Sequence, residues 1–141
     1  MEGSSNASSL VRPSVTAHYE ILLVDDEEDV RTLLCDILQR RGFAIESVSS
    51  AAACLRQLRI HDVSIVVTDI EMPGMSGIEL CERLRDRHPD VIVVVVSGRT
   101  DEATMTAARA SGAFRIMRKP VESKAIDRVL REAINTLERR N

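Results

Sequence analysis

Five polar side chains in this sequence directly follow short apolar runs. They are Asp25 and Asp26 after the first run, Asp69 after the second, Ser97 closing the third and Lys119 closing the fourth. In an open parallel sheet, the carboxyl ends of the strands meet at one crevice, which is where such folds place ligands. The pattern therefore predicts three carboxylates, a hydroxyl and an ammonium group at one sheet edge. That set suits chemistry on a phosphoryl group held by a divalent cation.

The three carboxylates need a compensating charge if they share one crevice. Two unit charges about 4 Å apart repel by about 4 kcal/mol at an effective dielectric constant of about 20. A bound Mg²⁺ relieves this repulsion, and it prefers oxygen ligands. Acids such as Asp25 and Asp26 are also favoured at a helix N-terminus by the helix dipole. That alternative explains the first pair without a metal, but it does not explain Asp69.

Composition limits the class of protein. The chain has 141 residues, 44% of them apolar and 2% aromatic, so we expect one domain with an aliphatic core. A net charge of -3 and the absence of a dense basic block argue against direct nucleic-acid binding. Three cysteines without CxxC spacing fit a reducing compartment. The longest apolar run, 91–96, is too short for a membrane span, and no signal peptide is apparent. We therefore expect a cytoplasmic protein without membrane association.

The chain divides into a short tail and one domain. Residues 1–18 are rich in Ser and lack apolar periodicity, which predicts a disordered N-terminal tail. Residues 19–139 alternate apolar runs with helical patterns and contain no internal repeat. We therefore expect no output domain in this chain, so that any output passes through partners or through the rest of a longer protein.

The domain pattern alternates strands with helices. Ser76 and Glu79 match a capping box, and Gly42 and Gly112 are expected to end helices. We expect strands at 21–24, 44–48, 65–68, 91–96 and 114–118, a helix carrying Val30 to Leu38, and helices near 50–59, 76–87, 101–111 and 123–139. Such alternation predicts an α/β fold, a parallel sheet with helices on both faces. The very apolar run 91–96 is expected to be a central strand.

Over about residues 20–138, the sequence resembles the receiver domain of two-component response regulators. The motifs that carry the resemblance are Val24-Asp25-Asp26-Glu27, Asp69 followed by Met72-Pro73-Gly74-Met75-Ser76-Gly77, Ser97-Gly98 and Lys119-Pro120. Each motif is common alone, but the four in this order are specific. The resemblance implies a flavodoxin-like, doubly wound sheet of five parallel strands in the order 2-1-3-4-5, with five helices.

The resemblance also implies a role for each site residue. It implies that Asp69 accepts a phosphoryl group. It implies that Mg²⁺ is bound directly by Asp26, Asp69 and the backbone carbonyl of Glu71, and by Asp25 through a water molecule. It also implies that the Ser97 hydroxyl donates a hydrogen bond to the phosphoryl group and that the Lys119 ammonium pairs with it. A cis Lys119–Pro120 bond is implied as well. The implied donor is a phosphohistidine of a sensor histidine kinase or a histidine phosphotransfer protein. The resemblance further implies that a homodimer would form through the last two helices and the final strand.

Two positions depart from the family pattern. Family members usually carry an aromatic residue three positions before the lysine, where this chain has Ile116. Phe114 lies two residues earlier and is expected on the same strand face. We therefore expect signalling through shifts of 97–111 without an aromatic swing. We also expect an ion pair between Glu71 and Arg99 that partly covers the site and modestly prolongs the phosphorylated state.

Two other functions compete with this interpretation. A Mg²⁺-dependent phosphohydrolase with an aspartyl-phosphate intermediate would use the same acids, with Glu71 two residues after the nucleophile. Such enzymes generally need a cap over the substrate, for which this chain has little room. A receiver-like adaptor that never accepts a phosphoryl group is the other alternative, although the acidic set is complete. We therefore expect a phosphorylation switch with an unidentified downstream protein partner, and no enzyme.

Overall fold

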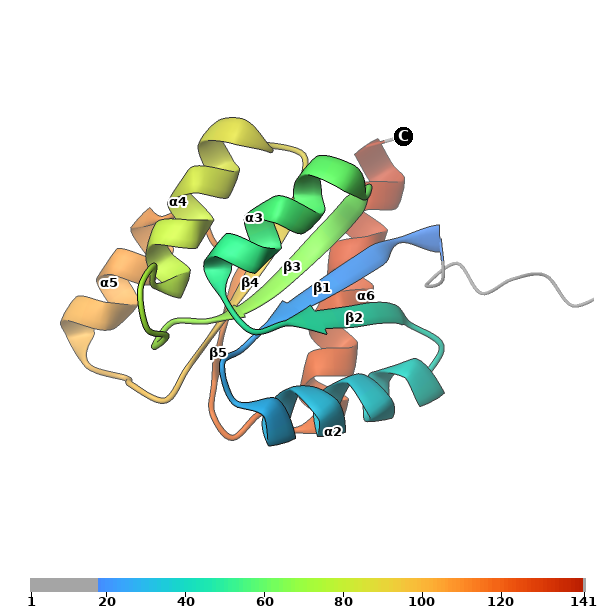
Figure 1. The fold of residues 1–141 in the computed structure, drawn as a ribbon, viewed down its shortest axis with the longest axis horizontal. Coiled ribbons are helices and arrows are strands. Elements are labelled where there is room, and N and C mark those ends of the chain that lie inside the picture. Colours follow the sequence, from blue (N-terminus) through green and yellow to red (C-terminus); the bar gives the residue numbers. More distant parts are fainter. Residues whose placement is uncertain (1–17, 141) are drawn as a thin grey trace, which may run out of the picture.

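Residues 18–140 are described by a computed structural model. The predicted disordered tail therefore lies, apart from His18, outside the described residues. The elements alternate along the chain as β1 (Glu20–Val24), α2 (Glu28–Arg40), β2 (Ala44–Val48), α3 (Ala51–Ile60), β3 (Val63–Asp69), α4 (Gly77–Arg87), β4 (Ile92–Ser97), α5 (Glu102–Ala110), β5 (Arg115–Arg118) and α6 (Ser123–Arg140). Figure 1 shows them as one twisted sheet between helices.

The sheet has five parallel strands in the order β2-β1-β3-β4-β5. This order and the five helices confirm the predicted flavodoxin-like fold. Strand β4 is an interior strand between β3 and β5, as expected from the very apolar run 91–96. All six residues of β4 are buried, because helices cover both faces of the sheet.

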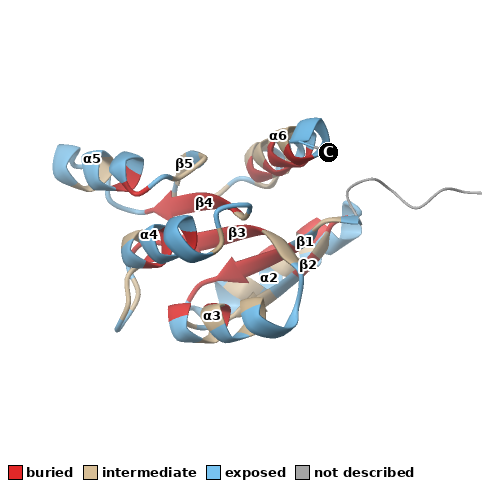
Figure 2. Cartoon of the chain, turned by 90° about the horizontal axis from the view of Figure 1, so that it is seen from above, coloured by how far each residue is buried: buried red, intermediate tan, exposed pale blue. Residues whose placement is uncertain are grey.

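Two aliphatic cores lie on opposite faces of the sheet. One joins alternate strand residues to α2 and α6, with Leu38 and Leu130 fully buried. The other joins the intervening strand residues to α3, α4 and α5, with Leu84 fully buried. Figure 2 shows the buried residues concentrated in the strands and on the helix sides that face them. The two-residue alternation of the strands therefore produces both cores.

Local sequence signals fix several helix ends. The Ser76 hydroxyl accepts the Glu79 N–H, and the Glu79 carboxylate accepts the Ser76 N–H, which confirms the predicted capping box. The Asp101 carboxylate caps α5 by accepting the Thr104 N–H. No helix in the described part of the chain is both long and apolar enough to cross a bilayer.

An ion-pair cluster joins α6 to the end of α2. The Asp127 carboxylate lies 2.6 Å from Arg131 Nε and 3.1 Å from Arg41 Nη1, and its side chain is 13% exposed. The hydrogen bond from Arg131 lowers the pKa of Asp127, and the contact with Arg41 adds to this effect against the opposing effect of burial. We expect Asp127→Asn to lower the free energy of unfolding at neutral pH by about 1 kcal/mol.

The pH dependence of this loss follows from the lowered pKa of Asp127. The stabilisation is fully present above the unfolded-state pKa, about 3.9, and disappears as the pH falls through the lower folded-state value. Urea unfolding of both proteins should therefore give a constant difference between pH 5 and 7 that narrows below about pH 4. The control is Asp36→Asn, whose exposed pair with Arg40 should contribute less. Equal losses in the two variants would contradict the prediction.

Candidate functional site

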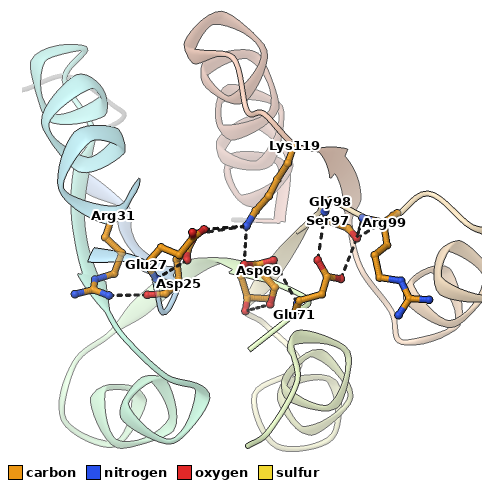
Figure 3. A network of polar contacts seen from close by, with 10 residues as sticks. Asp25, Glu27, Arg31, Asp69, Glu71, Ser97, Gly98, Arg99 and Lys119 are labelled. Atoms are coloured by element: carbon orange, nitrogen blue, oxygen red, sulfur yellow. Dashed lines mark hydrogen bonds and ion pairs between the residues drawn. The ribbon is translucent and has the colours of Figure 1, made fainter. Parts of the chain in front are cut away.

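Strand register brings the polar residues to one edge of the sheet. Val24 of β1 is paired with Thr68 of β3, and Asp69 is paired with Val96 of β4. The residues that follow these pairs therefore lie side by side at the carboxyl ends of neighbouring strands. Figure 3 shows the resulting network, in which the Lys119 side chain reaches in above Asp69 from the segment after β5.

Three carboxylates gather at this edge. Asp25, Asp26 and Asp69 each present an oxygen, and the three oxygens lie within 4.8 Å of one another. Asp25 and Asp69 are each only 4% exposed, whereas Asp26 faces solvent. Oxygen-only donors on a partly open crevice fit a hard cation such as Mg²⁺, which keeps several waters. Sequence reasoning thus identified all three members of the cluster.

Lys119 is the cationic partner of the acidic cluster. Its Nζ lies 2.7 Å from Asp69 Oδ2, 3.7 Å from Glu27 Oε1 and 3.9 Å from Asp25 Oδ2. Burial by itself would lower the pKa of Lys119, but the hydrogen bond to Asp69 and the three negative charges outweigh burial and raise the pKa. The ammonium group therefore stays charged beside Asp69. The Lys119–Pro120 bond is cis, as predicted.

Asp25 is held by the start of α2. The Glu27 N–H donates to Asp25 Oδ1 at 2.9 Å, and Arg31 donates to the Asp25 backbone carbonyl at 2.8 Å. Burial raises the pKa of Asp25 above its usual value, against the lowering effects of the Glu27 N–H and Lys119. A nearby cation therefore favours the ionised form of Asp25.

Asp69 lies at the wall of a cavity of about 370 Å³ between α2 and the segment after β5. Its carboxylate is recessed rather than projecting from the surface, at 4% exposure. The cavity is also lined by Asp25, Lys119 and apolar side chains that include Val30 and Pro120. Asp25, Asp69 and Lys119 therefore line one cavity, together with apolar side chains.

The prediction of an ion pair between Glu71 and Arg99 is wrong. Arg99 Nε instead lies 3.1 Å from the Asp101 carboxylate, because Asp101 caps α5 only two residues away. The Glu71 carboxylate accepts hydrogen bonds from the Ser97 hydroxyl at 3.1 Å and from the Gly98 N–H at 3.3 Å. Figure 3 shows Glu71 pointing toward Ser97 and Arg99 turned away.

The prediction that Phe114 lies on the same strand face as Ile116 is also wrong. Phe114 precedes β5 and packs against the core shared with α2 and α6. Ile116 packs against the opposite core, with α3, α4 and α5. The two residues therefore lie on different faces, because the chain before Arg115 has not yet entered the regular alternation of the strand.

Sequence reasoning missed two contributions to the site. Glu27 approaches Lys119, and the Glu71 carboxylate engages Ser97. The second contact had a signal in the sequence. Glu71 lies just after the apolar run of β3, Ser97 ends the apolar run of β4, and these two strands are neighbours in the sheet. Its direction depends on side-chain rotamers and on the capping residue Asp101, which spacing alone does not determine.

Comparisons with known proteins agree with this geometry. The family model described as response regulator receiver domain matches residues 21–131. The transcriptional regulatory protein FixJ of Rhizobium meliloti (strain 1021) is 37% identical over 116 residues, which cover 82% of this chain and 55% of FixJ. The C4-dicarboxylate transport transcriptional regulatory protein DctD of the same organism is 32% identical over 126 residues, covering 89% of this chain and 27% of DctD.

A solved structure agrees as well. The signal receiver domain of an HD domain-containing protein from Pseudomonas fluorescens Pf-5 has a TM-score of 0.81 at 25% identity, covering 85% of this chain and 97% of that chain. The chain thus spans nearly all of a solved receiver domain. It spans only about a quarter to a half of the two curated relatives above.

Proposed function

The chain belongs to the response regulator receiver domain family, whose role is phosphoacceptor signalling, and on that premise we propose that Asp69 is its phosphoacceptor. The observation that carries the proposal is the 2.7 Å contact between Asp69 Oδ2 and Lys119 Nζ, at the same sheet edge as Asp25 and Asp26. A carboxylate beside a fixed ammonium can accept an anionic group, because the ammonium offsets the incoming charge.

The proposed transfer is an in-line displacement at phosphorus. A carboxylate oxygen of Asp69 forms a new P–O bond while the P–N bond of a phosphohistidine breaks, and the imidazole leaves with the electron pair. The product is an acyl phosphate on Asp69. Lys119 exchanges its contact with the free carboxylate for contacts with phosphoryl oxygens, and the Ser97 hydroxyl donates to the same group.

We also propose Mg²⁺ as the cofactor of this reaction. Asp26, Asp69 and the backbone carbonyl of Glu71 would hold it, and Asp25 would contribute through a bound water. The clustering of three carboxylate oxygens supports this set. The bound ion would supply positive charge to the phosphoryl oxygens.

The proposed partners follow from the chemistry. The donor is a sensor histidine kinase or a histidine phosphotransfer protein, and the output passes to a protein partner. The segment from α5 through α6 is the proposed surface for a homodimer. A cytoplasmic setting is supported by three cysteines that are all unpaired thiols, two of them buried in the core.

The phosphohydrolase alternative is not favoured, because the matched family is a signalling domain. We propose that the chain is not an enzyme beyond assisting its own phosphorylation and slow dephosphorylation. A phosphomonoester such as p-nitrophenyl phosphate separates the two functions. The switch holds at most one phosphate on each chain at a time and releases it slowly, whereas an enzyme would turn the substrate over rapidly.

The test is labelling with acetyl phosphate and Mg²⁺, followed by intact-mass spectrometry. We expect one added phosphate on the wild-type protein, no addition to Asp69→Ala, and normal addition to the control Asp62→Ala, since Asp62 is exposed and distant from the site along β3. Omitting Mg²⁺ should lower the extent of labelling. Labelling that persists in Asp69→Ala, or an unlabelled wild-type protein that is folded, would reject the proposal.

A further inference from the structure

The Glu71 carboxylate lies across two hydrogen-bond donors at the end of β4. Its Oε2 accepts from the Ser97 hydroxyl at 3.1 Å, and its Oε1 accepts from the Gly98 N–H at 3.3 Å. Each oxygen thus has its own donor, as the oxygens of a bound anion would. Asp69, on the neighbouring strand, has its backbone paired with Val96, the residue before Ser97. The two donors therefore lie at the carboxyl end of the strand beside the one that carries Asp69.

No cation neutralises Glu71 in the described part of the chain. The Arg99 guanidinium pairs with Asp101, and the Lys119 ammonium pairs with Asp69, Asp25 and Glu27. The Ser97 and Gly98 donors are therefore the contacts that orient the Glu71 carboxylate. Hydrogen bonds to a charged acceptor are stronger than neutral ones, so these two bonds stabilise the Glu71 carboxylate in this position.

The Ser97 hydroxyl has a single proton to donate. It already accepts the Arg99 N–H at 2.9 Å, and its proton is shared between Glu71 Oε2 and the Arg99 carbonyl, the latter at 2.9 Å. The hydroxyl cannot serve a phosphoryl oxygen on Asp69 while its proton is directed to Glu71 or to the Arg99 carbonyl. Of these two acceptors Glu71 is the anion, and it therefore competes with a phosphoryl oxygen for the same proton.

We propose that the Glu71 carboxylate is an internal competitor of the phosphoryl group for the Ser97 hydroxyl and the Gly98 amide. This inference rests on the proposed function of Asp69. Glu71 keeps both donors preorganised for an anion in the unphosphorylated state, and phosphorylation displaces it. Glu71 is thus a positioning residue. It lowers the affinity of the site for phosphoryl groups and the extent to which small anionic phosphodonors phosphorylate Asp69.

The competition also offers a switch that needs no aromatic swing. Releasing Glu71 changes the hydrogen bonding of Ser97, the last residue of β4, and of Gly98, the first residue of the connection that leads to α5. That connection also contains Arg99 and ends at Asp101, the residue that caps α5. Displacement of one carboxylate therefore acts directly on the segment that precedes α5, in a chain with Ile116 at the aromatic position.

Binding of beryllofluoride, a phosphoryl mimic that attaches to a carboxylate oxygen, tests the competition at equilibrium. In Mg²⁺ we expect Glu71→Gln to bind it roughly tenfold more tightly than the wild-type protein, since the amide cannot accept from both donors with the strength of a carboxylate. The amide resonances of Gly98 and Arg99 should shift in the free variant toward their positions in the beryllofluoride complex. The matched control Glu82→Gln, an exposed residue on α4 with the same charge change, should bind like wild type.

A double-mutant cycle separates competition from simple charge repulsion. In a Ser97→Ala background the gain from Glu71→Gln should fall to about threefold or less, because one contested donor is gone. An equal gain in both backgrounds, or no gain from Glu71→Gln in wild type, would overturn the competitor while leaving phosphoacceptance intact. A wild-type protein that binds no beryllofluoride and accepts no phosphate would overturn both proposals together.

Discussion

Lys119→Met is expected to lower the free energy of unfolding by about 2 kcal/mol in the absence of divalent cations. Lys119 Nζ is the ammonium partner of Asp69 and Asp25, both 4% exposed, and it also approaches Glu27. Methionine preserves the length of the side chain but leaves the buried carboxylates without a cation. The loss is smaller than for a fully buried pair, because the Lys119 side chain is itself 26% exposed.

Magnesium should reverse most of this loss. Lys119 and a divalent cation compensate the same carboxylates, so removing the ammonium should raise the affinity for Mg²⁺ and with it the stabilisation that Mg²⁺ gives. Urea unfolding of both proteins in EDTA and in Mg²⁺ measures this linkage. The control is Lys124→Met, an exposed lysine in the first turn of α6, which should match wild type in both buffers. The proposed cation site would be contradicted if Mg²⁺ stabilised Lys119→Met no more than wild type.

The fold could be predicted from the sequence because each level of pattern agreed with the next. Apolar runs of four to six residues, a capping box at Ser76 and glycines at helix ends all indicated the same alternation of strands and helices. The positions with φ of 96° at Gly42 and Gly112 follow α2 and α5, where helices end. The strand order came from the family resemblance, because hydrophobicity alone does not separate the middle strand from its interior neighbour.

The site could be predicted as far as backbone topology determines it. Asp25, Asp26, Asp69, Ser97 and Lys119 lie at or just after strand ends, so the parallel sheet brings them together whatever their rotamers. The partner of Glu71 was mispredicted because charge complementarity with Arg99 competed with a nearer acid, Asp101. Spacing along a sequence indicates which residues are near one another, whereas short-range hydrogen bonds decide between neighbours.

The second large effect concerns Gly77, the first residue of α4. A Cβ built at this position would overlap the backbone carbonyl oxygen of Asp69 and would lie 2.8 Å from the Asp69 carbonyl carbon and 3.0 Å from Ile70 Cα. The Gly77 N–H also donates to the Ile70 carbonyl at 3.0 Å, which holds the helix start against the end of β3. Only a residue without a side chain permits this approach, and the obstruction is backbone, which cannot rotate away.

We therefore expect Gly77→Ala to lower the free energy of unfolding by about 2–3 kcal/mol and to reduce acetyl phosphate labelling, because α4 and the backbone of Asp69 must separate. The midpoint of urea unfolding measures the first effect, and an unchanged slope would show that the denatured state is unaffected. The control is Gly98→Ala, where the nearest atoms to a new Cβ are 3.9 Å away, an ordinary contact. If Gly77→Ala were as stable as Gly98→Ala, the close approach of α4 to Asp69 would not be what requires glycine at this position.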